Sequence, residues 1–345
     1  MKPQIIDIVR FLEFSENTPI ADVRSPSEFN SGHIPGAVNI PLFDDKEREA
    51  VGIKYNREGR TPAILEGLKY SGPALGKKLE QALKIAKNNQ LLLHCWRGGM
   101  RSEAMSWLFS LGGIEVKVLE GGYKSYRRHI LSCLEEKRNM IVLGGMTGSS
   151  KTHILRYLKS MGQQILDLEQ LANHKGSAFG ALGQEAQPST EHFANLLFTE
   201  CNKLNRNQPL WIEDESRNIG SVFMPDLFYL NMQETPVVVL VMDTKTRLPR
   251  LMSEYSVFPK ELLIASLIKI SRRLGGDMTS SAIDAVENGD LAKAIEIVLH
   301  YYDKAYMYGL KKKNGTNIIY VNADTDDIEA NALKVLDAGG KIKWD

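Results

Sequence analysis

The sequence predicts an α/β protein with two parallel-sheet domains, the second of which ends in a helical region. Strand-like apolar runs alternate with helix-like segments in both halves of the chain. Each half also places a glycine-rich loop between a buried strand and a helix. A length of 345 residues is sufficient for two such domains.

Composition excludes several classes of protein. The chain is 43% hydrophobic and 25% charged, as in ordinary globular proteins, and its net charge of +1 gives no global sign of nucleic-acid binding. The longest apolar run, at 237–242, is far short of the roughly 18 residues of a membrane helix, and Asp7 and Arg10 interrupt the N-terminal apolar run. Three cysteines without a CxxC spacing predict a reduced, cytoplasmic protein with no zinc site and no certain metal site.

Local patterns place the elements of the first domain. Residues 1–14 predict a first strand and a turn, "IADVR" and "AVNIP" predict strands, and a short helix is expected to open at Glu28 between them. The apolar run "NQLLLHC" predicts a buried strand, "RSEAMSWLFSLGG" has helical spacing, and "EVKVL" predicts the next strand. This order of strand, helix and strand is typical of a parallel sheet.

The loop "HCWRGGMRS" joins a predicted strand to a predicted helix and is the first candidate site. Glycines there let successive backbone N–H groups turn toward one point, and a helix N-terminus favours an anion. This setting, with two arginines, favours the thiolate of Cys95, which we predict to be the catalytic nucleophile, while His94 is expected to orient the loop. The spacing alone fits either a cysteine phosphatase or a carrier of sulfur or selenium. The predicted anion loop comprises Trp96, Arg97, Gly98, Gly99, Met100 and Arg101.

The segments "DVRSPSEFNSGHIPGAVNIP", "HCWRGGMRS" and "VKVLEGGYKSY" together resemble a rhodanese domain over residues 1–130. The rhodanese fold is shared by sulfurtransferases and by one class of phosphatases, so the resemblance implies a fold before it implies a reaction.

A second loop follows the charged segment "LEEKRN". The stretch "MIVLGGMTGSSKTHIL" runs from an apolar strand through glycines into a helix and nearly matches the phosphate-binding pattern G-x-x-x-x-G-K-[ST]. Ser150 stands where the pattern has its second glycine, so it either strains the backbone or adds a hydroxyl to the loop. We predict a diphosphate-binding P-loop formed by Gly145, Thr147, Gly148, Ser149, Ser150, Lys151 and Thr152.

A carboxylate is expected beside the P-loop, on the side of a bound Mg²⁺ if the site uses that cation. Glu213, Asp214 and Asp243 each follow an apolar run, and of these we favour Asp214. Asp167, at another strand end, is the second candidate.

The C-terminal part predicts helices over 258–277 and over 284–313, the latter broken near Asn288 and Gly289. Tyrosines at 301, 302, 306 and 308 are expected to be mainly core. Several basic side chains are candidates for phosphate contacts, although each by itself is expected to be a solvated surface charge: Lys124, Arg127, Arg128, Arg217, Arg272 and Arg273.

The whole chain resembles the tRNA 2-selenouridine synthase family, in which a rhodanese domain (here 1–130) precedes a P-loop NTPase-like domain (here 138–345). The resemblance lies in "HCWRGGMRS", "DLEQLANHKGSAFG", "QPSTEHFANLL", "EDESRNIG", "FPKELL" and "YYDKAY". It implies a transferase that converts 2-thiouridine at the wobble position of tRNA to 2-selenouridine. It further implies selenophosphate and geranyl diphosphate as co-substrates, an S-geranyl intermediate, and a selenophosphate-supplying enzyme as partner. The alternative is a rhodanese-fold phosphatase or sulfurtransferase fused to a kinase-like domain.

Overall fold

A computed structural model describes residues 3–313 and 317–344. The chain divides into two compact units, one of Met1–Cys133 with Ala194–Phe198 and the other of Leu134–Phe193 with Thr199–Asp345. The division falls within helix α7 (Gly122–Glu135), which extends into the segment expected to be a linker. Both units are α/β with parallel five-stranded sheets, as the sequence predicts.

The first unit is built on a sheet of strand order β1-β5-β4-β2-β3, in which every pairing is parallel. Besides α7, its elements are β1 (Gln4–Ile6), α1 (Ile8–Ser15), β2 (Ile20–Asp22), α2 (Pro26–Ser31), β3 (Val38–Asn39), α3 (Asp45–Glu58), α4 (Arg60–Ser71), a 3₁₀ turn (Gly72–Ala74), α5 (Leu75–Ile85), β4 (Gln90–His94), α6 (Met100–Leu111) and β5 (Glu115–Leu119).

Sequence and structure differ at the N-terminus of this unit. Residues 8–15 form helix α1 instead of the expected turn, because Asp7 caps it by accepting a hydrogen bond from the N–H of Arg10 (2.9 Å) and Phe11 is fully buried. The core forms where β2, β4 and β5 meet α5 and α6, with Leu93, Phe109 and Ala82 fully buried. The packed strands therefore position the Cys95 loop, which follows the carboxyl end of β4.

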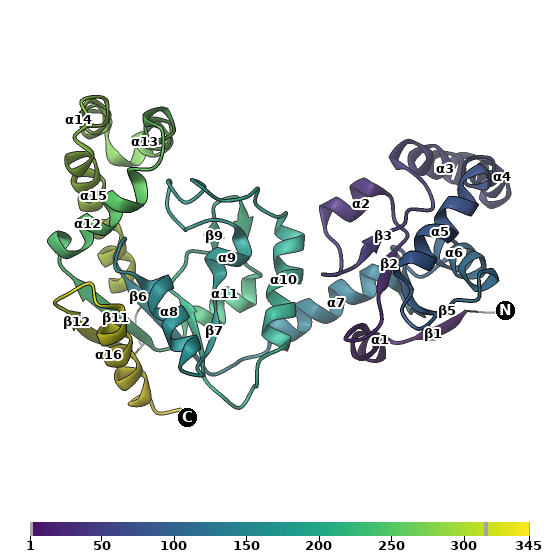
Figure 1. The fold of residues 1–345 in the computed structure, drawn as a ribbon, viewed down its shortest axis with the longest axis horizontal. Coiled ribbons are helices and arrows are strands. Elements are labelled where there is room, and N and C mark those ends of the chain that lie inside the picture. The colour runs from purple at the N-terminus through teal and green to yellow at the C-terminus, as the bar shows by residue number, and fades with distance from the viewer. Residues whose placement is uncertain (1–2, 314–316, 345) are drawn as a thin grey trace. The chain divides into compact units, whose positions relative to one another are not determined.

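The second unit has the parallel strand order β12-β11-β6-β8-β7 and a separate antiparallel ribbon of β9 and β10 (Figure 1). Its elements are β6 (Met140–Gly145), α8 (Lys151–Ser160), β7 (Gln164–Leu166), α9 (Leu168–Ala172), α10 (Thr190–Asn202), β8 (Leu210–Glu213), β9 (Asn218–Ile219), β10 (Val222–Phe223), α11 (Asp226–Gln233), β11 (Val237–Met242), α12 (Thr244–Tyr255), α13 (Lys260–Leu274), α14 (Gly276–Glu287), α15 (Leu291–Lys311), β12 (Ile318–Ala323) and α16 (Ile328–Gly340).

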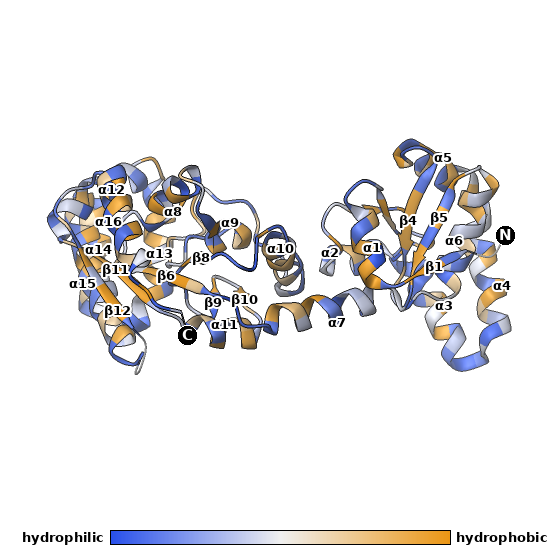
Figure 2. Ribbon diagram, turned by 90° about the horizontal axis from the view of Figure 1, so that it is seen from below, coloured by the Kyte–Doolittle hydropathy of each residue, from blue (hydrophilic) through white to orange (hydrophobic). Residues whose placement is uncertain are grey.

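Helices α8 and α16 cover one face of this sheet, where they bury Trp211 against β6 and β11. Figure 2 shows the central strands β6 and β11 as apolar, as expected for strands covered on both faces. A Cβ atom on Gly339 of α16 would lie 2.4 Å from the Trp211 ring, so only glycine allows this close approach. Helices α12 to α15 form the predicted helical part, with the break at Asn288 and Gly289. No helix in the described part of the chain is both long and apolar enough to span a membrane.

Candidate functional sites

The Cys95 loop occupies residues 95–99, between β4 and α6. Strand β4 lies between β2 and β5, so the loop leaves the carboxyl edge near the middle of the sheet. The carbonyls of Cys95 and Trp96 accept hydrogen bonds from the N–H groups of Tyr123 (2.8 Å) and Lys124 (3.0 Å). Among the described residues, the N–H groups of residues 96–99 donate no hydrogen bond. Four backbone donors beside a cysteine thus remain available to an anion.

Two glycines bring the start of α7 against this loop. Gly98 has φ +70°, and a Cβ atom on it would lie 2.9 Å from the carbonyl oxygen of Leu119. Gly122 has φ +60°, and its Cβ atom would lie 2.4 Å from the carbonyl oxygen of Cys95. Any larger residue at either position would displace the loop backbone. The "LEGGY" segment therefore holds the anion loop in shape.

Arg101 and Arg97 have different surroundings. Arg101, in the first turn of α6, makes a bidentate pair with Glu28 of α2, with N···O distances of 2.5 and 3.1 Å. Burial alone would raise the pKa of Glu28, but the Arg101 guanidinium lowers it overall. An internal carboxylate therefore balances the cation at this helix N-terminus. Arg97 is exposed, and Met100 is exposed at the start of α6.

His94 lies in a buried polar network beneath the loop. Asp22 and Arg24 are fully buried and joined by hydrogen bonds of 2.6 to 3.0 Å, and the Arg24 guanidinium stacks on the Tyr123 ring at 3.8 Å. His94 Nε2 lies 3.7 Å from Asp22. Burial lowers the pKa of His94, so its neutral form is favoured at pH 7. Neither ring nitrogen of His94 has a hydrogen-bond partner among the described residues, so its orienting role stays a prediction.

An open cavity of about 1110 Å³, including its solvent-exposed part, lies beside the Cys95 loop. Arg97, Lys124 and Arg128 line it, together with the carboxylates of Asp7 and Glu120. Two of the basic residues singled out in the sequence thus share one wall with Arg97. Cys95 itself is buried and does not line this cavity.

The P-loop spans residues 145–152, between β6 and α8. Lys151 Nζ donates to the loop carbonyls of Gly145 (2.9 Å) and Met146 (3.5 Å), so its charge lies within the loop. The Ser149 hydroxyl is fully buried and has no hydrogen-bond partner among the described residues. An unpaired buried hydroxyl beside Lys151 and a helix N-terminus fits a site for an anion.

Ser150 keeps the backbone geometry of the glycine that it replaces. Its φ of +65° and ψ of 21° are left-handed, which costs an L-residue about 1–2 kcal/mol. Its hydroxyl donates to Asp326 (2.9 Å), which also pairs with Arg250 (2.7 Å). The serine hydroxyl is thus engaged with Asp326 and not directed into the loop.

Two glutamates meet at Thr152, the last residue of the P-loop. The Thr152 hydroxyl lies 2.8 Å from Glu213 and 3.0 Å from Glu169. The register between β6 and β8 explains the position of Glu213, because Glu213 pairs with Leu143, which lies just before the P-loop. Burial, and then the Glu169 charge, raise the pKa of Glu213. This hydroxyl and two carboxylates are the oxygen ligands that Mg²⁺ prefers, although no group of three or more His, Cys, Asp and Glu in the described ranges is arranged to hold a metal.

The two carboxylates favoured from sequence have other partners. Asp214 pairs with Lys313 (2.7 Å) and accepts from the Tyr306 hydroxyl (3.1 Å), which in turn accepts from the P-loop N–H of Gly145 (2.8 Å). Asp167 caps α9 and pairs with Arg156 (3.2 Å). Asp214 thus contacts the P-loop through a tyrosine, whereas Glu213 and Glu169 contact Thr152 directly. The other acidic residue, Asp243, lies at the N-terminus of α12.

The carboxyl group of Glu215, near the charge of Glu169, predicts that the protein loses stability as the pH rises. Burial and then the Glu169 charge raise the pKa of Glu215 to about 8, above the value of about 4.3 for an unfolded chain. A raised carboxyl pKa stabilises the fold below the unfolded value, and this contribution is lost as pH rises through about 8. We therefore expect Tm to fall between pH 5 and 8, and to fall less in Glu215→Gln. Calorimetry from pH 5 to 9 tests this, with Glu185→Gln as the exposed control; parallel curves for wild type and Glu215→Gln would contradict it.

The fold and the two loops define a class of protein, a rhodanese-like domain joined to a P-loop domain. Residues 9–129 match the family model of the rhodanese-like domain. Residues 138–334 match the family model described as the tRNA 2-selenouridine synthase AAA domain. The chain belongs to the tRNA 2-selenouridine synthase family.

Curated relatives match along nearly the whole chain. A tRNA 2-selenouridine synthase of Nitrosomonas europaea is 32% identical, over 87% of this chain and 91% of its own. That of Shewanella denitrificans is 34% identical, over 91% and 94%, and that of Bordetella petrii is 35% identical, over 87% and 89%. The similarity therefore includes both domains.

Proposed function

We propose that this chain is a transferase that converts 2-thiouridine at the tRNA wobble position to 2-selenouridine. Selenophosphate supplies selenium, and geranyl diphosphate supplies the alkyl group of an S-geranyl intermediate. The observation that carries the proposal is the presence in one chain of two different anion loops: free amides beside Cys95, and a P-loop with Lys151. The first suits a selenium donor and the second suits a leaving diphosphate.

In the first step, the sulfur of 2-thiouridine attacks the allylic carbon. A carbon–sulfur bond forms, the carbon–oxygen bond to diphosphate breaks, and the base loses its N3 proton. Lys151, the buried Ser149 hydroxyl and the N-terminus of α8 stabilise the negative charge that develops on the diphosphate. The alkylated sulfur is then a better leaving group than the original thiocarbonyl.

In the second step, selenium forms a bond to C2 of the base and geranylthiol leaves with a proton. The amides of residues 96–99 hold the anionic donor, and the Cys95 sulfur attacks its phosphorus, so that a sulfur–phosphorus bond forms and the selenium–phosphorus bond breaks. The released selenide attacks C2, and water then cleaves the sulfur–phosphorus bond, which releases phosphate and restores Cys95.

Mg²⁺ is proposed as a cofactor of the P-loop. Thr152, Glu213 and Glu169 would hold it, since their oxygens already converge within hydrogen-bond distance. When bound, Mg²⁺ would neutralise charge on the diphosphate. In this role, Glu213 and Glu169 would supply the carboxylates that the sequence assigned to Asp214 and Asp167.

The proposed partners follow from the substrates. The anticodon loop must present its wobble base unstacked, and Arg97, Lys124 and Arg128 are candidates to contact its phosphates. An enzyme that makes selenophosphate is the proposed source of the donor. Substrates of this kind would place the reaction in the cytoplasm.

The direct test supplies the wild-type protein with 2-thiouridine tRNA, geranyl diphosphate, selenophosphate and Mg²⁺. We expect nucleoside mass spectrometry to show S-geranyl-2-thiouridine without selenophosphate and 2-selenouridine with it. Omission of geranyl diphosphate should lower selenation at least tenfold. The proposal fails if neither nucleoside appears with the complete mixture.

A further inference from the structure

The second unit contains an apolar cavity next to the P-loop. Its volume is about 460 Å³, including the part open to solvent. Its exposed wall is apolar. Helices α12 to α15 form most of the wall, and Phe179 and Ser177 of the loop after α9 close another side.

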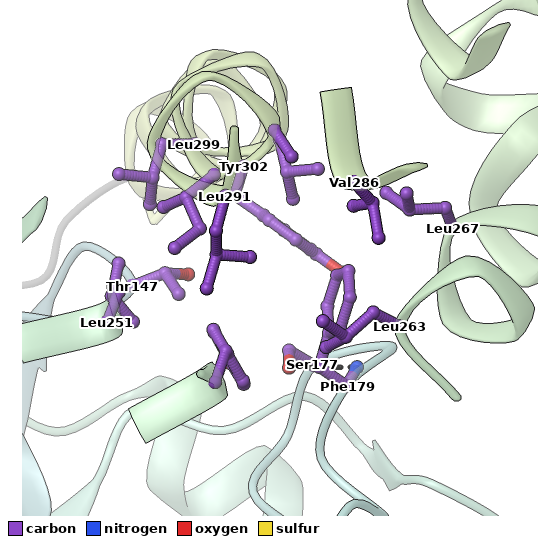
Figure 3. Close-up of a pocket in the computed structure, with 14 residues that line it drawn as sticks. Thr147, Ser177, Phe179, Leu251, Leu263, Leu267, Val286, Leu291, Leu299 and Tyr302 are labelled. Atoms are coloured by element: carbon purple, nitrogen blue, oxygen red, sulfur yellow. Dashed lines mark hydrogen bonds between the residues drawn. The ribbon is translucent and has the colours of Figure 1, made fainter. Parts of the chain in front are cut away.

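The cavity begins at the P-loop itself. Figure 3 shows Thr147 and Leu251 on one side, and Leu267 and Val286 on the opposite side. Thr147 belongs to the P-loop, and its carbonyl accepts a hydrogen bond from Arg247 of α12 (2.9 Å). Arg247 also pairs with Asp303 of α15 (2.6 Å). The helices that line the cavity are thus tied to the loop that binds the anion.

The lining tyrosines support an apolar occupant. The Tyr302 hydroxyl accepts a hydrogen bond from the N–H of Ala178 (3.1 Å), so its polar atom is already engaged by a backbone donor. A nucleoside in this cavity would bury polar base and ribose groups without partners, which is costly. A hydrocarbon chain requires no such partners.

We propose that this cavity binds the hydrocarbon tail of a diphosphate ester whose head group lies in the P-loop. The inference rests on the proposed function, because it assigns a site to the allyl group of the first step. The tail would run from Thr147 toward Val286, so the residues at the far end would limit its length. Each methylene that fits should strengthen binding about fourfold, and a chain that is too long should lose this gain.

The experiment compares allylic diphosphates of five, ten and fifteen carbons. Transfer to 2-thiouridine tRNA is measured as kcat/KM, and non-hydrolysable thiolo-diphosphates of the same chains are titrated by calorimetry. Val286→Phe should shorten the cavity and lower the ratio of ten-carbon to five-carbon binding at least tenfold. Val286→Ala should raise the ratio of fifteen-carbon to ten-carbon binding at least tenfold. Ratios within one variant cancel any loss of folded protein.

Ala285→Val is the matched control, since Ala285 is buried in the same helical core but does not line the cavity. Its chain-length ratios should equal those of the wild type. Affinities that are independent of chain length, or ratios unchanged in both Val286 variants, would overturn the inference even if transfer occurs. Conversely, chain-length-dependent binding without transfer would uphold the cavity and refute the proposed reaction.

Discussion

Lys151→Ala is expected to lower S-geranylation of 2-thiouridine tRNA by about 10²- to 10³-fold, the usual effect of removing one group that stabilises transition-state charge. Lys151 Nζ already lies 2.9 Å from the P-loop carbonyl of Gly145, within the loop proposed to hold the diphosphate. Loss of the cation leaves the departing diphosphate without its point charge. Because selenation depends on the geranyl intermediate, it should fall equally. Mass spectrometry of the nucleosides over time measures both products.

Lys159→Ala is the matched control, because Lys159 is an exposed lysine in the last turn of the same helix, α8. Its rates should stay within twofold of the wild type. When pre-formed S-geranyl tRNA is supplied, the Lys151→Ala protein should convert it to 2-selenouridine tRNA at the wild-type rate. A Lys151→Ala enzyme that geranylates normally would remove the P-loop from the first step.

The strand–loop–helix structure around both loops was predictable because each is local in sequence. A buried strand, closely spaced glycines and a helix start within about ten residues determine where backbone donors and the helix N-terminus lie. It was harder to predict which of Glu213 and Asp214 contacts the P-loop, although the alternation of side chains along β8 indicates the answer. Glu213 shares a strand face with Trp211, which packs with α8, the helix that carries Thr152. Asp214 extends to the other side and meets Lys313.

Contacts between distant segments were not predictable from one sequence. Glu28 and Arg101 lie 73 residues apart, so nothing local pairs them. The Tyr306 bond to Gly145 spans 161 residues and depends on how α15 crosses the sheet. The apolar cavity is assembled from four helices and two loops, and each helix alone has an ordinary amphipathic pattern.

Cys95→Ser is expected to abolish selenation, by at least 10²-fold, and to leave S-geranylation within twofold of the wild type. Serine is close to cysteine in size, so the buried packing around residue 95 and the amides of residues 96–99 should be kept. Only the nucleophilic sulfur is lost, and a neutral hydroxyl is a poor nucleophile in its place. S-geranyl tRNA should therefore accumulate when all substrates are present.

Cys133→Ala controls for loss of a thiol as such, since Cys133 is another cysteine of the first unit and lies in α7. It should give both products at wild-type rates. Gly98→Ala separates the amides from the sulfur, because its Cβ atom would lie 2.9 Å from the Leu119 carbonyl oxygen and displace the loop. Selenation should fall in this variant although Cys95 is present. If Cys95→Ser still forms 2-selenouridine at an undiminished rate, the sulfur takes no covalent part in the reaction and the loop only holds the donor.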